Sequence, residues 1–214
     1  MAPVTRDRMR QPVWVRTKDF SLESGAWCMD VLATKRTMRA EVRARLAKLA
    51  PARRALEEEL VTAAIQDSAE WRRARTVFLY RSIVPELSTV GLANGAWREG
   101  KRVLFPRIAA AGLSLHEVMG WTGFEAGPLG IPQPLASPVV EAGSVDMAII
   151  PGVAWDREGG RLGRGGGHYD RVLPSLELAW GVGFDAQLVD LVPREAHDKR
   201  VQRVMAPSLL PVET

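Results

Sequence analysis

Apolar side chains recur at helical spacing near the start of the chain, at Val31, Leu32, Met38, Val42, Leu46 and Leu49. Positions three and four residues apart share one face of a helix, so this spacing predicts a helix over residues 31–49. Pro51 is placed to begin a second helix, which we expect to run to about Asp67. Two helices should therefore open the domain.

Beyond these helices, apolar runs alternate with helical patterns. We predict strands at 76–80, 102–105, 113–118, 146–150 and 180–184, and helices at 89–99 and 169–176. Residues 123–138 are rich in Gly and Pro and predict a loop whose length suits a lid or a pocket wall. The alternation predicts an α/β fold: a three-layer Rossmann-like domain with a mostly parallel sheet and helices on both faces.

Residues 1–30 show no convincing periodicity and are interpreted as an N-terminal extension of uncertain order. The 214-residue length then fits one domain over residues 31–214. Met29 and Met38 are alternative starts of translation, although a start at Met38 would remove Lys35.

Composition and charge exclude several classes of protein. No apolar run is long enough to cross a bilayer and no signal-peptide block follows Met1, which predicts a cytoplasmic protein without membrane contact. The single cysteine, Cys28, cannot form an internal disulfide and is interpreted as a bystander. Residues 1–75 carry 16 Lys and Arg against 10 Asp and Glu, but Glu57, Glu58 and Glu59 interrupt the basic run. A solvated helix face is therefore favoured over a nucleic-acid surface.

The segment from Arg161 to Asp170, Arg-Leu-Gly-Arg-Gly-Gly-Gly-His-Tyr-Asp, has the composition of an anion-binding loop. Its glycines leave backbone N–H groups unshielded and free to adopt positive φ, and a helix that starts near His168 would add unpaired donors. Arg161 and Arg164 supply positive charge, and Asp170 offers a hard oxygen ligand for a magnesium-bound nucleotide. The pattern therefore indicates a phosphate site.

The surroundings of this segment decide between a binding loop and a flexible surface turn. The segment matches neither the Walker loop nor the dinucleotide fingerprint, and glycine clusters alone are equally typical of turns. The apolar run 146–150, closed by Pro151-Gly152, predicts a buried strand just upstream. Ligands in open α/β sheets bind at the carboxyl ends of strands, which favours the binding loop.

The two motifs together resemble the 5-formyltetrahydrofolate cyclo-ligase family, also called methenyltetrahydrofolate synthetases. In that family a Pro-Gly-x-x-aromatic-Asp run precedes Arg-Leu-Gly-x-Gly-x-Gly-Tyr/His-Tyr-Asp, as residues 151–156 and 161–170 do here. Further motifs follow in family order over residues 34–205: Lys35-x-x-x-Arg39, Tyr80 through Glu86 to Thr89, Gly100-Lys101-Arg102 with Pro106-Arg107, Gly130-Ile131-Pro132-Gln133-Pro134, and Gly183-Phe184-Asp185-x-Gln187 to His197-Asp198. The chain departs from the common pattern at His168, where many members have Tyr, and at Ala206, where Thr is frequent.

The resemblance implies an ATP-dependent ligase that closes a carbon–nitrogen ring. It would convert 5-formyltetrahydrofolate to 5,10-methenyltetrahydrofolate with release of ADP and phosphate, through an imidate phosphate, with ATP as co-substrate and Mg²⁺ as metal. Phosphorylation turns the formyl oxygen into a leaving group, so the reaction requires no side-chain nucleophile. We expect a monomer whose partners are the folate and ATP, without nucleic acid or membrane.

Particular residues acquire expected roles from the resemblance. ATP would contact Lys35, Arg39, Arg161, Leu162, Gly163, Arg164, Gly165, Gly166, Gly167, His168 and Tyr169. Lys35, Arg39 and Arg164 would be catalytic because they neutralise charge in phosphoryl transfer. Glu86, Arg164 and His168 would bind the folate, and Asp170 and Asp198 would bind Mg²⁺. We expect Arg164→Ala or Asp170→Ala to lower turnover far more than stability.

Taken alone, several of these residues have simpler interpretations. Lys35 and Arg39 are spaced as on a solvated helix face, and Asp198 as in a surface salt bridge. Lys101 and Arg107 either face the phosphates or are exposed strand-end cations. Trp121 and Trp155 either wall the pocket or lie buried with their N–H groups satisfied.

Two rival functions use the same sequence. One is a related α/β protein that keeps the nucleotide pocket but has changed or lost the folate chemistry. The other is a nucleic-acid-binding module built on the N-terminal helices, whose affinity would fall steeply with salt.

Overall fold

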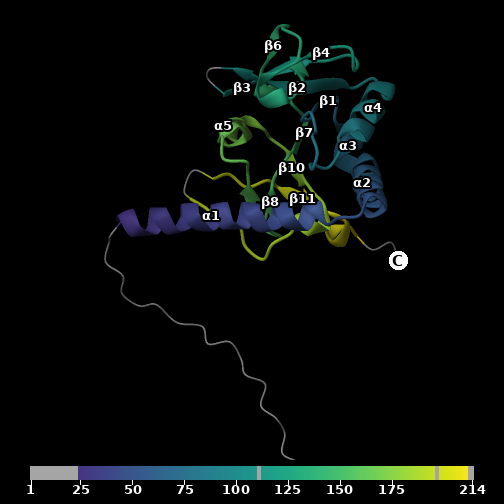
Figure 1. Ribbon diagram of the computed structural model, residues 1–214. Helices are drawn as coiled ribbons and strands as arrows, with labels where there is room; N and C mark the ends of the chain where they lie inside the picture. Colours follow the sequence, from purple (N-terminus) through teal and green to yellow (C-terminus); the bar gives the residue numbers. More distant parts are fainter. Residues whose placement is uncertain (1–23, 110–111, 196–197, 212–214) are drawn as a thin grey trace, which may run out of the picture.

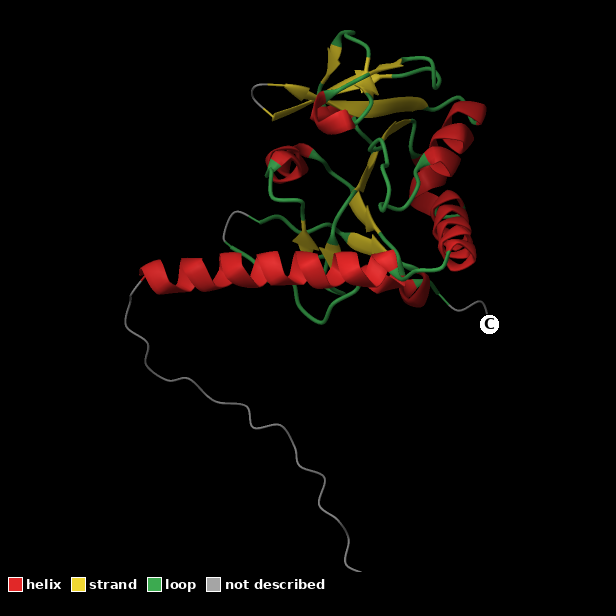
Figure 2. Ribbon diagram, in the orientation of Figure 1, coloured by secondary structure: helices red, strands yellow, loops and turns green. Residues whose placement is uncertain are grey.

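The computed structural model describes residues 24–109, 112–195 and 198–211, which fold around one central sheet (Figures 1 and 2). The α-helices are α1 (Ser24–Ala47), α2 (Pro51–Gln66), α3 (Ala69–Arg73), α4 (Val90–Arg98) and α5 (His168–Val172). The strands are β1 (Thr76–Phe78), β2 (Arg102–Ala109), β3 (Gly112–Glu117), β4 (Phe124–Glu125), β5 (Gln133–Pro134), β6 (Val139–Val140), β7 (Met147–Ile150), β8 (Ala154–Trp155), β9 (Arg161–Leu162), β10 (Ala179–Val182) and β11 (Arg203–Met205).

The seven strands of the main sheet lie in the order β11-β10-β7-β1-β2-β3-β6. The pairs from β11 to β2 are parallel, whereas β3 and β6 are antiparallel additions at one edge. The mostly parallel sheet predicted from the alternation of elements is confirmed. From β1 the chain proceeds first to β2 on one side and later to β7 on the other, so the strand order reverses beside β1. A crevice opens outside the carboxyl ends of strands at such a reversal, which is where open α/β sheets bind ligands.

Side chains of the central strands alternate between two core clusters, one on each face of the sheet. One cluster holds Val77 of β1 with Met147 and Ile149 of β7, together with residues of α1, α2, α3 and α4. The other holds Phe78 of β1 with Ala148 and Ile150 of β7, together with residues of α5. Figure 1 shows α2, α3 and α4 on one side of the sheet and α5 on the other. Because both faces are covered, β7 is apolar at every position and β1 at every position after Thr76, as parallel strands usually are.

The first two helices are present, with one boundary shifted. α2 begins at Pro51, where a missing N–H has no cost because the first amides of a helix have no intrahelical partner. α1 begins at Ser24 rather than near residue 31, so part of the segment interpreted as an extension is helical. The rest of that segment, residues 1–23, lies outside the described residues.

Short elements account for the other differences from the predicted pattern. The predicted helix 169–176 stops as α5 at Val172 and continues as a 3-10 turn, Leu173–Ser175, because Pro174 has no N–H to continue an α-helix. The predicted loop 123–138 contains the paired strands β4 and β5. α3, β6 and β11 were missed, because elements of two to five residues are too short to show a hydrophobic period.

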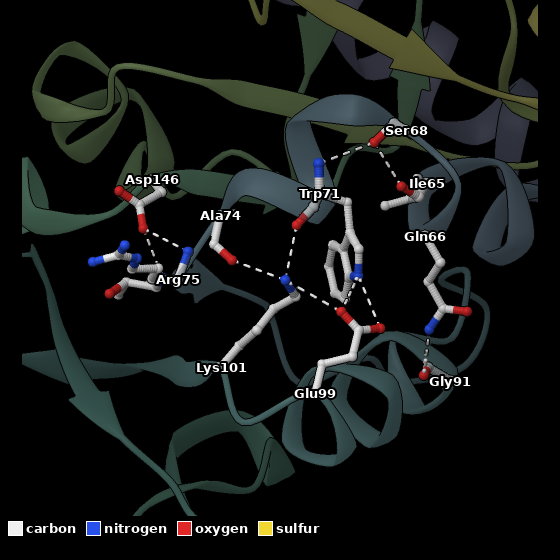
Figure 3. Close-up of polar contacts among 11 residues, drawn as sticks. Ile65, Gln66, Ser68, Trp71, Ala74, Arg75, Gly91, Glu99, Lys101 and Asp146 are labelled. Atoms are coloured by element: carbon white, nitrogen blue, oxygen red, sulfur yellow. Dashed lines mark hydrogen bonds and ion pairs between the residues drawn. The ribbon is translucent and has the colours of Figure 1, made fainter.

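The amino ends of β1 and β2 are held by a network around α3 (Figure 3). Lys101, just before β2, donates to the carbonyl oxygens of Trp71 and Ala74, both at 2.9 Å, and pairs with Glu99 at 3.2 Å. The Asp146 carboxylate accepts from the backbone N–H groups of Arg75 and Thr76 at 2.8 Å. Only 7% of the Lys101 side chain is exposed. Both interpretations of Lys101 were therefore wrong: it neither faces the carboxyl edge nor lies exposed, but secures the end of α3.

Candidate active site at the carboxyl edge of the sheet

The segments after β1 and after β7 meet at the strand-order reversal and form a cleft of ≈ 360 Å³. The lining residues are Arg43, Leu46, Val84, Pro85, Glu86, Gly152, Val153, Arg164 and Gln187. Glu86 comes from the segment after β1, and Arg164 from the glycine-rich segment beyond β7. The cleft therefore brings together residues of the two motifs that the sequence placed at strand ends.

The glycine-rich loop follows the β8–β9 hairpin and leads directly into α5. Gly165 has φ 109° and Gly167 has φ 63°, backbone conformations that side chains other than glycine rarely adopt. Residues 165–167 are exposed, and their N–H groups donate to no other residue that the structure describes. α5 has only five residues, so these loop amides are the main donors and the helix dipole is a minor addition.

The last two residues of the Pro-Gly-x-x-aromatic-Asp run, Trp155 and Asp156, are buried and structural. Asp156 is fully buried, and its carboxylate accepts from the N–H groups of Gly160 at 2.7 Å, Glu158 at 3.0 Å and Val192 at 3.0 Å. Trp155 is fully buried and donates to the Val182 carbonyl at 3.0 Å. For Trp155 the alternative of a buried, satisfied indole is confirmed. Both residues fix the hairpin that presents the glycine loop.

Arg161 and Asp170 bracket the loop and form an ion pair. Arg161 Nη2 lies 2.7 Å from Asp170 Oδ1, and only 4% of the Arg161 side chain is exposed. The guanidinium also lies 5.7 Å from the centre of the Tyr169 ring, while its Nε is buried without a partner in the described structure. Tyr169 stacks on Phe78 of β1, and burial raises the pKa of its hydroxyl, so it stays a neutral hydrogen-bonding group. This pair ties the start of α5 to the hairpin.

Arg164 joins the glycine loop to Glu86. Its Nη2 lies 2.8 Å from Glu86 Oε1, and the second carboxylate oxygen accepts from the Ile83 N–H at 3.1 Å. Burial raises the pKa of Glu86, and the bonds to Ile83 and Arg164 only partly oppose this effect. The Arg164 side chain is 46% exposed, so it can change partners without unfolding its surroundings.

The cations of α1 approach the loop from the side. Arg39 Nε donates to the Gly163 carbonyl at 2.8 Å. One helical turn earlier, Lys35 Nζ lies 2.6 Å from Asp198 and 2.7 Å from Glu195. Burial lowers the pKa of Lys35, but the hydrogen bonds to Asp198 and Glu195 outweigh it, so the net pKa is raised. Lys35 is buried, so the interpretation of a solvated helix face was wrong for it.

Two residues assigned to the nucleotide occupy different surroundings. The Leu162 side chain is in the core at 1% exposure, and its carbonyl accepts from the Val153 N–H. Leu162 therefore offers neither group to the loop, whose exposed backbone belongs to its neighbours. The His168 ring lies against Gly166, where an added Cβ would be 2.8 Å from its Cδ2, and its Nδ1 is buried without a described partner. His168 therefore shapes the loop beside the exposed amides.

The family model described as the 5-formyltetrahydrofolate cyclo-ligase family matches residues 31–207. The chain belongs to the 5-formyltetrahydrofolate cyclo-ligase family.

Known cyclo-ligases are similar to this chain over most of its length. The 5-formyltetrahydrofolate cyclo-ligase of Mycolicibacterium smegmatis is 34% identical over 145 residues, which cover 62% of this chain and 74% of that protein. The cyclo-ligase of Mus musculus is 26% identical over 191 residues, or 82% and 94% of the two chains. The NMR structure of Aquifex aeolicus 5,10-methenyltetrahydrofolate synthetase matches with a TM-score of 0.74 and 30% identity over 81% of this chain and 90% of that one. The α/β fold is thus the fold of a cyclo-ligase.

The carboxylates expected to hold Mg²⁺ are placed on either side of the α1 cations. Asp170 Oδ1 pairs with Arg161, and Asp198 Oδ2 accepts from Lys35 and from the Glu195 N–H at 2.7 Å. Within the described ranges, no group of three His, Cys, Asp or Glu side chains that could hold a metal ion occurs. The donors therefore fit an ion that arrives with phosphate ligands, as Mg²⁺ commonly does, rather than a resident metal cage.

Sequence reasoning assigned no role to three polar residues of this edge, although Gln187 belongs to a family motif quoted above. Glu195 shares Lys35 with Asp198, Arg43 lines the cleft one turn after Arg39, and Gln187 lines it while donating to the Gly152 carbonyl at 2.7 Å. Arg43 is the one with a clear signal, because it continues the four-residue spacing from Lys35 to Arg39.

Arg107 and Trp121 belong to the side of the sheet formed by β2 and the β4–β5 segment. Arg107 pairs with Glu125 and donates to the Pro134 carbonyl at 2.6 Å, so it fixes the β4–β5 segment. Trp121 packs among Trp97, Phe105 and Phe124 and donates to Asn94 at 2.9 Å.

None of the helices in the described ranges combines the length and apolar character that crossing a membrane requires.

Proposed function

We propose that this chain converts 5-formyltetrahydrofolate to 5,10-methenyltetrahydrofolate in an ATP-dependent reaction that releases ADP and phosphate. The observation that carries the proposal is the ion pair between Arg164 and Glu86 at 2.8 Å, within the cleft at the strand-order reversal. It joins a loop built for phosphate to a buried carboxylate suited to a donor-rich heterocycle. Family membership supports both halves.

The phosphate half rests on three features that converge on the glycine loop. Exposed amides at residues 165–167 offer donors, Arg39 contacts the loop at Gly163, and Arg164 extends from within it. Arg161, Arg164 and Lys35 are each paired with a carboxylate. Phosphate oxygens accept charge-assisted hydrogen bonds in the same two-point geometry as carboxylates, so nucleotide binding would exchange these partners rather than desolvate new cations.

The folate half rests on Glu86. Its carboxylate is 15% exposed at the side chain and lines the cleft. A carboxylate can accept two parallel N–H bonds from the amino-pyrimidine edge of a pterin, a match that fixes the orientation of the ring. Arg164, which pairs with Glu86, and His168, whose ring lies against Gly166, are the other residues expected to contact the folate.

The proposed chemistry needs positioning and charge neutralisation, not a protein nucleophile. The formyl oxygen attacks the γ-phosphorus, the bond to the ADP oxygen breaks, and an imidate phosphate forms. The second folate nitrogen then attacks the activated carbon and loses its proton, the carbon–oxygen bond breaks, and phosphate leaves. Lys35, Arg39 and Arg164 would hold the γ-phosphoryl group in line and stabilise its charge.

Mg²⁺, when bound, would supply further neutralisation of the phosphate charge. Asp170 and Asp198 are the carboxylates that would hold it, as hard oxygen donors beside the nucleotide. Exchange of Arg161 and Lys35 from these carboxylates to phosphate would leave each carboxylate with one cation fewer when the ion binds.

The direct test is a spectroscopic assay of methenyl product on purified protein, with and without ATP. We expect product only when ATP is present. Arg164→Ala should lower turnover by about a hundredfold or more, because it removes charge stabilisation in the transition state. Arg72→Ala, an exposed arginine on α3 at the opposite edge, is the matched control and should be unchanged. Folded wild-type protein that binds ATP but forms no product would contradict the proposal and favour altered chemistry in the same pocket.

A further inference from the structure

Arg81 is a partly buried arginine that lacks an acceptor. It follows the end of β1 by three residues, and its guanidinium carbon lies 4.9 Å from the centre of the Trp121 ring and 5.6 Å from that of Phe124. Its Nε is buried and has no hydrogen-bond partner within the part of the chain that the structure describes. Its terminal nitrogens make no hydrogen bond or ion pair to any described residue, and they are not sealed from solvent as Nε is.

Among the other arginines at this edge, Arg43 likewise has no hydrogen bond or ion pair to a described residue but is exposed to solvent, whereas four have acceptors. Arg39 donates to Gly163, Arg107 pairs with Glu125, Arg161 with Asp170 and Arg164 with Glu86. A partly desolvated guanidinium without an acceptor is unfavourable, and native structures rarely retain one without a ligand or ion to satisfy it. The aromatic faces hold the Arg81 plane in place but accept no N–H bond from its edge. Arg81 is therefore pre-positioned for an anion.

The sheet topology places Arg81 on a particular side of the cleft. The Glu86 segment follows β1, and β1 has β7 on one side and β2 on the other. The glycine loop, with Arg164, belongs to the β7 side. Trp121 and Phe124 belong to the β2 side, since Phe124 packs against Phe105 of β2 at 5.0 Å between ring centres. Because Arg81 packs against Trp121 and Phe124, it lies on the β2 side of β1, away from the glycine loop.

We propose that Arg81 binds a carboxylate of the glutamate tail of the folate substrate. This inference rests on the proposed function, because it uses Glu86 as the pterin contact and the glycine loop as the phosphate site. A folate carries its pterin at one end, an aromatic ring in the middle and glutamyl carboxylates at the other end. With the reacting end directed at the glycine loop on the β7 side, a tail that leaves toward the β2 side meets Arg81, whose guanidinium has no acceptor among the described residues. A planar, fixed guanidinium edge matches a carboxylate in two-point geometry.

A phosphate ligand for Arg81 is disfavoured by the same arrangement. The exposed loop amides and the cations of α1 lie on the β7 side, so the nucleotide phosphates have their donors away from Arg81. Arg81 would accordingly set substrate specificity without taking part in the chemical step.

The test compares two substrates that differ only in the tail: 5-formyltetrahydrofolate and 5-formyltetrahydropteroate, which lacks the glutamate. Arg81→Gln should raise the KM for the glutamate-bearing substrate by about tenfold or more, as expected for loss of a charged hydrogen-bonded pair. The KM for the truncated substrate, the KM for ATP and both kcat values should stay the same. Arg72→Gln on α3 is the control and should leave all of these values unchanged.

Calorimetric binding of the same two compounds keeps the inference separable from the proposed function. If wild-type protein binds both compounds but turns over neither, the proposed reaction fails while the tail contact is still measured. Equal losses for both compounds, or a rise in the KM for ATP, would overturn the assignment of Arg81. Should Arg81→Gln fail to fold, Arg81→Lys keeps the charge without the planar fork and should weaken binding of the glutamate-bearing compound alone.

Discussion

The two ends of the parallel strands use the same residue types in opposite ways. At the amino edge, Lys101 donates to the fixed carbonyls of Trp71 and Ala74 and is reinforced by Glu99 (Figure 3). At the carboxyl edge, Lys35 has two carboxylates as acceptors, contributed by a segment far away in the sequence. One lysine completes secondary structure, and the other is held by side chains.

The difference teaches which cations can change partners. Removal of Lys101 from its carbonyls would leave the end of a helix without satisfied acceptors, so no ligand is expected to recruit it. Removal of Lys35, Arg161 or Arg164 from carboxylates needs only another anion, and phosphate provides one. The comparison therefore predicts separate effects: changes at the amino edge should lower stability, and changes at the carboxyl edge should lower activity.

The largest effect is expected at Asp170, where a substitution should lower both stability and activity. Asp170→Ala should abolish most turnover and also lower the free energy of unfolding by about 3 kcal/mol, because it leaves the buried Arg161 without its partner. The expectation from sequence was that turnover would fall far more than stability; the buried ion pair adds a loss of stability that should be measurable. Denaturant unfolding and steady-state turnover of the same preparation measure both quantities. A variant with unchanged stability would show that the Arg161–Asp170 pair does not support the fold.

A cleaner loss of activity is expected from Arg39. Arg39→Met keeps the aliphatic stem but removes the bond to the Gly163 carbonyl and a phosphate contact. The KM for ATP should rise by about tenfold or more, whereas the free energy of unfolding should change by less than about 1 kcal/mol because the group is only partly buried. Arg45→Met on the same helix is the control. Equal KM values for wild type and Arg39→Met would remove α1 from the nucleotide site.

The opposite pattern is expected from Lys101. Lys101→Met should lower the free energy of unfolding by about 2 kcal/mol, since the Trp71 and Ala74 carbonyls lose their donor. Folded variant should retain the wild-type KM for ATP and the wild-type turnover. A changed KM with unchanged stability would reverse the comparison between the two edges.

The smallest effect is a pH dependence of stability from Glu86. Because burial raises its pKa above the ordinary 4.5, the folded protein binds a proton more readily than the unfolded chain. Its contribution to stability is therefore fully present below pH 4.5 and is lost as pH rises through the folded pKa. Wild type should lose stability relative to Glu86→Gln over that rise, as followed by urea unfolding at several pH values. A constant difference between the two proteins would contradict the burial of this carboxylate.

Much of the fold could be predicted from the sequence because its signals are local. The period of α1, Pro51 at the start of α2, and the apolar runs of β1, β2, β7 and β10 all indicated the correct element type. Strands of two residues, such as β6, carry no period and were missed. The sheet order could be expected only in outline, since it depends on tertiary contacts.

The candidate site, like the fold, could be predicted from the sequence only in part. Motif order placed Lys35, Arg39, Glu86 and the glycine loop at one edge, and the structure brings them together. The partners of these residues could not be read from the chain, because Glu195 and Asp198 lie 160 and 163 residues from Lys35. Arg81 lies within the quoted run from Tyr80 to Thr89, but nothing in the sequence distinguished it. Its buried Nε without a described partner and its contacts with two aromatic rings are tertiary features.

The most direct test is an experimental structure of the protein with ADP and 5-formyltetrahydrofolate bound together. The account predicts that the ADP phosphates contact the N–H groups of residues 165–167, with Arg39 beside them and Glu86 against the pterin. Both ligands bound away from the cleft between the segments that follow β1 and β7, with the Arg164–Glu86 pair intact, would contradict it.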